Sequence, residues 1–138
     1  MKHGRKVKKL NRTSSHRKAL LSNLVSSLVI HKQIITTDIK AKELKRYAER
    51  LVSYAKKDNL HGRRLILKNI KGSNNKSIAN ILIHEIAPMY KDRNGGYTRI
   101  IKLSNRKNDN ALVSMIEFVD FKKANSNDNS KEKDKIVS

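Results

Sequence analysis

A large excess of positive charge is the feature that most constrains how this chain can fold. Its 138 residues include 32 Lys and Arg but only 12 Asp and Glu, which gives a formal net charge of +20. Self-repulsion on this scale opposes compaction. A polyanion relieves that cost, and nucleic acid is the first candidate because each neutralised phosphate releases a condensed counterion. An anionic membrane surface would also satisfy the charge.

The size and composition of the chain allow one domain with one modest core. Hydrophobic residues make up 37% of the 138 residues, which suffices for a single core but not for two. With four Tyr, two Phe and no Trp, the core volume must come mainly from Leu, Ile and Val. The absence of cysteine excludes disulfides and thiolate metal sites, and it fits the reducing cytoplasm, where we expect the protein.

The N-terminal segment concentrates positive charge. Residues 1–13 contain six Lys or Arg and residues 1–37 contain nine, before Asp38 provides the first carboxylate. Apolar residues do not recur with a regular period until Leu20. We therefore interpret residues 1–13 as an extended basic arm that is disordered without its partner.

The same segment also resembles the start of a signal peptide, because a basic stretch precedes an apolar run at 19–30. Polar residues interrupt that run at helical intervals, at Ser22, Asn23, Ser26 and Ser27. No small-x-small cleavage site follows before Thr36, and the run is shorter than the roughly 20 residues of a membrane-spanning helix. We therefore expect no signal peptide and no membrane partner.

Residues 14–121 are predicted to form a single domain with four helices, because apolar residues repeat at helical spacing in four stretches. In the first stretch Leu20, Leu21, Leu24, Val25, Leu28 and Val29 share one face, and in the second Ala41, Leu44, Ala48, Leu51, Val52 and Ala55 do so. The predicted helices run from an N-cap at Ser14 or Ser15 to about His31, over about 39–57, over 60–70 with a stop at Gly72, and from after 73–75 to a termination at Pro88.

Three further stretches are typical of β-strands. They cover 33–37, 97–104 and 111–119, and the polar turn at 105–110 joins the last two into a hairpin. The predicted class is α+β, with about four helices packed on one face of a small sheet of about three strands. Residues 122–138 are polar and low in complexity, and we interpret them as a disordered tail.

The arm and its junction with the first helix are the main candidates for RNA contact. Flexible basic arms fold as they bind RNA, and a helix N-terminus offers free N–H groups to a phosphate. The arm contributes Lys2, His3, Arg5, Lys6, Lys8, Lys9 and Arg12, and the junction adds Asn11, Ser14, Ser15, His16, Arg17 and Lys18. The alternatives are a solubilising terminus, which needs no such bias of sign, and a capped helix with a solvated first turn.

Two further sites are weaker candidates. Gly95 and Gly96 would allow close approach of a sugar–phosphate chain, with Tyr97 stacked on a base and Arg99 on a phosphate. The alternative is a tight turn that needs positive φ, with Tyr97 in the core. Arg63 and Arg64, beside His61 at the start of the third helix, would extend the basic surface, although adjacent helical residues point in different directions.

The sequence gives little support to catalysis. The five histidines (His3, His16, His31, His61 and His84) are scattered. His84-Glu85 begins like a zinc protease motif, but Pro88 stands where the second histidine would be. Phosphate-binding glycine motifs, a serine nucleophile motif and paired acid–base carboxylates are also missing. We therefore expect a protein that is not an enzyme and has no metal, cofactor or small-molecule substrate.

Several of these stretches together resemble the bacterial large-subunit ribosomal protein family numbered seventeen. The matching residues, in the order of that family, are Met1-Lys2-His3, Leu10 to Ala19, Ser27-Leu28-Val29, Ile35-Thr36-Thr37, Lys40 to Leu44, Gly95 to Ile100, and Asn108 to Ala111. Each motif alone is weak, but the ordered set spans most of residues 1–120.

This resemblance implies an α+β fold, binding to large-subunit ribosomal RNA, neighbouring ribosomal proteins as partners, and no catalytic activity. It therefore predicts a structural constituent of the large ribosomal subunit in the cytoplasm. The chain departs from the family at Asp38-Ile39, where a hydrophobic residue and a proline are common, and beyond Asp120, where no familiar pattern continues.

Two other classes of protein fit the sequence less well. A DNA-compacting architectural protein would be equally basic and non-catalytic, but minor-groove benders usually insert an apolar or proline wedge from a β-arm, and the single proline here ends a predicted helix instead. A nucleic-acid-processing enzyme would need an acidic or metal-binding motif that the sequence lacks.

Overall fold

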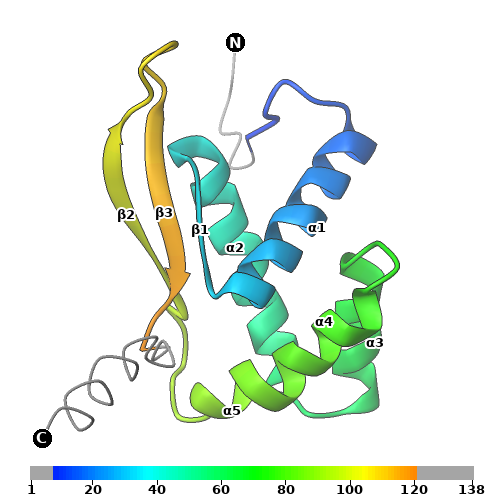
Figure 1. Ribbon diagram of the computed structural model, residues 1–138. Coiled ribbons are helices and arrows are strands. Elements are labelled where there is room, and N and C mark those ends of the chain that lie inside the picture. Colours follow the sequence, from blue (N-terminus) through cyan, green and yellow to red (C-terminus); the bar gives the residue numbers. More distant parts are fainter. Residues whose placement is uncertain (1–7, 121–138) are drawn as a thin grey trace, which may run out of the picture.

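The computed structural model describes residues 8–120 (Figure 1). In chain order the elements are α1 (Ser14–His31), β1 (Gln33–Thr37), α2 (Asp38–Ala55), α3 (Leu60–Asn69), α4 (Asn75–Ile81), the π-helical turn η1 (Leu82–Ile86), the short α5 (Ala87–Met89), β2 (Thr98–Asn105) and β3 (Leu112–Phe118). The first part of the predicted arm, 1–7, and the predicted tail, 122–138, lie outside the described residues. The predicted α+β class is confirmed: helices pack against a three-stranded antiparallel sheet.

The central element is α2, which contacts α1, α3, η1, α5 and all three strands. Its predicted apolar stripe is confirmed, since all six residues from Ala41 to Ala55 on that stripe are buried. Three of the six are alanines, which let neighbouring elements approach the helix closely. In α1, the predicted face is fully buried at Val25, Leu28 and Val29 and only partly buried nearer the N-terminus.

The second helix begins one residue earlier than the predicted Ile39. Asp38 is its first residue and is buried. One carboxylate oxygen of Asp38 accepts a hydrogen bond from Ser114 Oγ on β3 (3.1 Å), and the other pairs with Lys42 Nζ (2.7 Å). A carboxylate in the first turn also opposes the positive end of the helix dipole. Asp38 therefore both starts α2 and ties it to the sheet.

The fourth predicted helix ends at Met89, one residue after the predicted termination at Pro88. The helix passes from α4 into the π turn η1, where Ala87 N–H bonds to Leu82 O, five residues back. Pro88 then lies in the first turn of α5, where its missing N–H needs no helical partner, and the helix continues to Met89. The wider π turn thus accommodates the proline in the last turn of the helix.

The sheet has the order β1-β3-β2, with both pairings antiparallel. Ile34, Ile116 and Ile100 form one row across the three strands. Ile116 is fully buried, and the other two pack against the core, so this row faces the helices. Side chains alternate along strands, so the next row faces away from the helices. A register shift between Lys102 and Asn105 marks a bulge in β2 near the hairpin.

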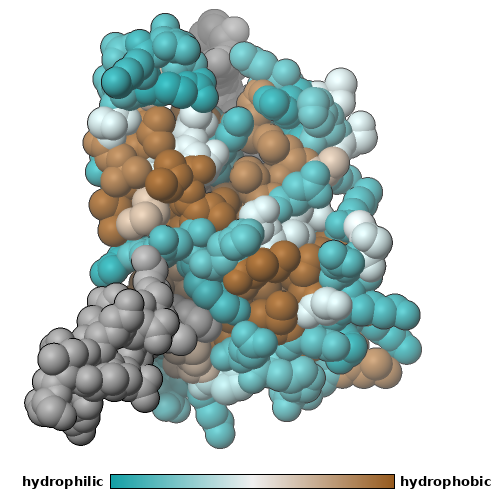
Figure 2. Space-filling model, viewed as in Figure 1, coloured by the Kyte–Doolittle hydropathy of each residue, from teal (hydrophilic) through white to brown (hydrophobic). Residues whose placement is uncertain are grey.

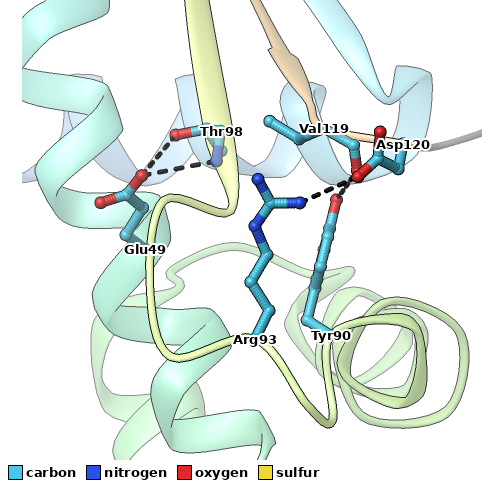
Figure 3. A network of polar contacts seen from close by, with 6 residues as sticks. All are labelled: Glu49, Tyr90, Arg93, Thr98, Val119 and Asp120. Atoms are coloured by element: carbon cyan, nitrogen blue, oxygen red, sulfur yellow. Dashed lines mark hydrogen bonds and ion pairs between the residues drawn. The ribbon is translucent and has the colours of Figure 1, made fainter.

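A network of polar contacts joins the segment before β2 to the end of β3 (Figure 3). Glu49 of α2 accepts hydrogen bonds from the backbone N–H and the hydroxyl of Thr98, at 3.4 and 3.1 Å. On the other side, the Tyr90 hydroxyl donates to Val119 O, and burial raises the pKa of Tyr90 to about 12. These contacts hold the loop between α5 and β2 against the body of the domain.

Candidate nucleic-acid interface

The described part of the arm turns back onto the helices. Lys8 N–H donates to Glu43 Oε1 of α2 (3.2 Å), and Arg12 N–H donates to Lys9 O (3.2 Å). Leu10 and Asn11 between them adopt left-handed φ values of 55° and 50°. The arm therefore enters α1 through a defined tight turn.

Arg17, in the first turns of α1, holds this turn in place. Its Nη1 donates to Arg12 O (3.2 Å) and to Lys9 O (3.4 Å). A guanidinium has five N–H donors, so Arg17 keeps further donors beyond those that bind the backbone.

The N-terminus of α1 has neither a side-chain cap nor a carboxylate in its first turn. The N-cap is Thr13 rather than the predicted Ser14 or Ser15, and its side chain makes no capping hydrogen bond. The first turn contains no acidic residue, so nothing there offsets the positive end of the helix dipole. Ser14, Ser15 and His16 are exposed around this end. The predicted cap was wrong because Ser14 and Ser15 have already adopted helical geometry.

Arg12 lies at the centre of this junction. Its Nη1 donates to Leu10 O (3.1 Å). Within residues 8–120, its Nε is the one buried side-chain nitrogen or oxygen with no hydrogen-bond partner. Buried polar groups are usually paired, because an unpaired donor has lost its water. An anion at the junction would supply the missing acceptor.

The structure brings together the predicted residues from Lys8 to Lys18 at this one end of the domain. Lys9, Asn11 and Lys18 are exposed there. Lys2, His3, Arg5 and Lys6 lie outside the described residues.

Arg63 and Arg64 belong to a different region, on α3, which packs against α2 and α4. Arg63 donates to Asn80 Oδ1 of α4 (2.8 Å), whereas Arg64 is exposed. The two arginines therefore differ in environment, as the geometry of adjacent helical residues requires. Only Arg64 is fully presented to solvent.

The loop with Gly95 and Gly96 fits the turn interpretation. Both glycines have positive φ, at 151° and 62°, which other residues rarely adopt. Tyr97 is only 4% exposed and packs in the core, with its ring centroid 5.3 Å from that of Tyr90. Lys56 Nζ lies 5.4 Å from the centroid of the Tyr97 ring and donates to Arg93 O (2.6 Å). In this arrangement the face of Tyr97 is not available to a base.

Arg99 follows on β2 and is exposed, but it forms an ion pair with Glu117 directly across the sheet on β3. Its charge is therefore partly compensated within the domain, unlike the charges at the arm junction. Glu117 could not be predicted as this partner from the sequence, because register between strands depends on the fold.

Sequence reasoning also missed two residues that shape the interface. Glu43 is almost fully buried and anchors the backbone of the arm, and Lys56 braces the glycine loop. A carboxylate beside the apolar stripe of α2 was a usable signal for Glu43. Lys56 gave no such signal.

Within residues 8–120, no three His, Asp or Glu side chains cluster so that they could hold a metal ion. Among the helices of that region, none is long and apolar enough to cross a bilayer.

The fold and this interface define a class: small, strongly basic α+β proteins with a basic arm joined to an open helix N-terminus. Comparison with known proteins is more specific. The sequence model of the family described as "Ribosomal protein L17" matches residues 20–119. The chain belongs to this family.

Similar proteins carry the matching name "Large ribosomal subunit protein bL17". The protein from Amoebophilus asiaticus is 48% identical over 121 residues, which cover 88% of this chain and 61% of the relative. That from Akkermansia muciniphila is 47% identical, over 88% of this chain and 87% of the relative. That from Wolbachia pipientis is 50% identical, over 87% and 84% respectively. This chain thus spans less than two thirds of the Amoebophilus protein but most of the other two.

Proposed function

We propose that this protein is a non-catalytic structural constituent of the bacterial large ribosomal subunit, in the cytoplasm, and that it binds ribosomal RNA through its basic arm and basic helix surfaces. The names of its relatives support the ribosomal assignment. The RNA contact rests on one observation above all: Arg12, with a buried unpaired Nε, lies beside the uncapped N-terminus of α1.

The chemistry of this junction suits a phosphate. The N–H groups of the first helical turn point outward without intrahelical partners, and the dipole favours an anion there. Arg12 supplies a guanidinium donor from one side, and Lys9 and Lys18 supply exposed charge nearby. Phosphate contacts of this kind position a protein on RNA without reading its sequence. The arm before Lys8 extends the same charge along the chain.

The salt dependence of RNA binding tests this proposal. Deletion of residues 2–13 removes six Lys or Arg: Lys2, Arg5, Lys6, Lys8, Lys9 and Arg12. Each lost phosphate contact reduces the slope of log K against log salt by about 0.7–0.9. If half to all of the six contact phosphates, the slope should fall by roughly 2–5, and affinity should fall most at low salt.

A truncation after Lys123 provides the matched control. It removes 15 residues that carry three Lys and three Asp or Glu, so the net charge stays at +20. We expect this variant to keep the full-length slope. An unchanged slope in the arm deletion would show that the arm is only a solubilising terminus, and the proposed RNA contact would be wrong.

A further inference from the structure

The face of the sheet that points away from the helices carries an apolar row. Ile35 on β1 and Ile101 on β2 both pair with Met115 on β3 in the middle, so the three side chains cross the sheet side by side. Ile35 is 64% exposed and Ile101 is 37% exposed, and Leu103, further along β2, is 46% exposed. Figure 2 shows hydrophobic residues gathered over the strands at the left of the molecule. We call Ile35, Ile101, Leu103 and Met115 the open-face patch.

Two arginines at the ends of the open-face patch are paired with carboxylates. In the row beside it, Gln33 faces Glu117, and Glu117 pairs with Arg99. At the hairpin end, Arg106 forms an ion pair with Asp109, which holds the pKa of Asp109 at about 2. Arg99 and Arg106, at the two ends of the patch, are therefore matched by carboxylates, in a chain whose net charge is +20.

This charge pattern favours a protein surface over the other occupants. RNA is bound by unmatched cations and by exposed aromatic rings, whereas Arg99 and Arg106 beside the patch are paired and the patch itself is aliphatic. A second copy of this chain would bring another charge of +20 alongside, and long-range repulsion opposes that approach. An aliphatic protein surface needs neither unmatched cations nor exposed aromatic rings. The cores of protein interfaces are likewise depleted of charged residues.

We propose that the open-face patch is the surface on which a neighbouring protein of the large subunit docks, through aliphatic side chains of its own. This inference rests on the proposed function, because it places the partner in the ribosome. It separates the molecule into two faces: the arm junction binds RNA, and the far side of the sheet binds protein.

Single-cysteine variants test the proposal, since the chain has no cysteine of its own. Ile35→Cys places a thiol in the patch, and Leu60→Cys on α3 provides a control, because Ile35 and Leu60 are 64% and 63% exposed. In the free protein both should react with a maleimide at similar rates. In purified large subunits that carry the Ile35→Cys variant, the rate should fall at least tenfold. An equal rate in the free and assembled protein would overturn the proposal.

The covering molecule is identified with the same variant. A short maleimide photo-cross-linker on Ile35→Cys, activated in purified subunits and mapped by mass spectrometry, should join an aliphatic stretch of another protein. A cross-link to RNA, to a second copy, or to a charged stretch would contradict the proposal.

A paired substitution separates this proposal from RNA binding. Ile35→Ser with Ile101→Ser should leave the salt slope of RNA binding unchanged but should release the protein from subunits at lower salt. Leu60→Ser should show neither change, and circular dichroism should confirm that both variants fold. Retention equal to that of the unaltered protein, or a parallel loss of RNA affinity, would overturn the docking surface. If the unaltered protein were absent from large subunits, the proposed function itself would fail, and the docking proposal with it.

Discussion

Two leucines on α1, four residues apart, differ in their burial. Leu28 is fully buried, whereas Leu24 packs only partly against the core. We expect Leu28→Ala to lower the free energy of unfolding by about 2–5 kcal/mol, because it leaves a cavity that neighbours fill incompletely. Leu24→Ala should cost less. Urea denaturation measures both, with Leu60→Ala, on the exposed side of α3, expected to change stability by no more than about 0.5 kcal/mol. A larger effect at Leu24 than at Leu28 would contradict this packing.

Asp38 makes the stability of the domain depend on pH. Its hydrogen bond with Lys42 is the largest influence that holds its pKa below the ordinary value of 3.8. A carboxyl with a depressed pKa in the folded state stabilises the fold fully above its unfolded pKa, and this stabilisation is lost as pH falls through the folded pKa. The melting temperature should therefore fall as the pH drops below about 3.8.

Asp38→Asn isolates this contribution, since the amide cannot titrate. The variant should be less stable than the unaltered protein near pH 7, and the difference should shrink as the pH falls below 3.8. Thermal melts at a series of pH values would show the two curves converging. Parallel curves would mean that Asp38 contributes nothing through its charge.

Among single residues, the sequence predicted best where side-chain type alone decides the environment. Lys9 and Lys18 are exposed as expected. Tyr97 had two open interpretations, and only its packing against Tyr90 distinguishes them. The unpaired Nε of Arg12 could not be foreseen either, because it depends on how the arm folds back over the helix.

At the scale of elements, the close contact of α3 with the end of α2 depends on Gly62. A Cβ at this position would lie 2.4 Å from Tyr54 O, which is a backbone atom and cannot move alone. The Gly62 N–H also completes the N-cap of α3 by donating to Asn59 Oδ1 (2.7 Å). The glycine therefore allows both the cap and the helix contact.

Gly62→Ala should consequently destabilise the domain by about 1–3 kcal/mol, as overpacking of a tight contact does. Lys68→Ala, at an exposed position of the same helix, is the control for helix propensity. Chemical denaturation of the two variants gives the comparison. A Gly62→Ala variant as stable as the control would show that α3 can shift away from α2 without cost.

The elements themselves were largely predictable, because apolar periodicity differs between helices and strands. The exceptions have local causes. Pro88 indicates a helix end by its chemistry, yet a π turn before it shifts the register so that the proline begins a new turn. The helix α2 begins one residue early, at Asp38, whose carboxylate pairs with Lys42 and accepts a hydrogen bond from Ser114. The contact with Ser114 could not be predicted, because Ser114 lies far away in the sequence.

At the scale of the whole molecule, charge is distributed unevenly. The arm junction has an uncapped helix N-terminus without a carboxylate in its first turn, whereas the cations at the two ends of the open sheet face, Arg99 and Arg106, are each paired. The net charge of +20 predicted a polyanionic partner from the sequence alone. It did not predict the ion pair Arg99–Glu117 or the apolar pair Ile35–Met115 on the open sheet face, because both depend on strand register.

The central claim, that this protein is a constituent of the large ribosomal subunit held there by its charge, is tested most directly by sedimentation. Cell extracts are separated on sucrose gradients at moderate salt, and the isolated large subunits are then washed at rising salt. The protein should migrate with large subunits and should leave them only in strong salt or denaturant, as multiple phosphate contacts require. Recovery of most of the protein in the free fraction or with the nucleoid, and its absence from large subunits, would contradict the claim.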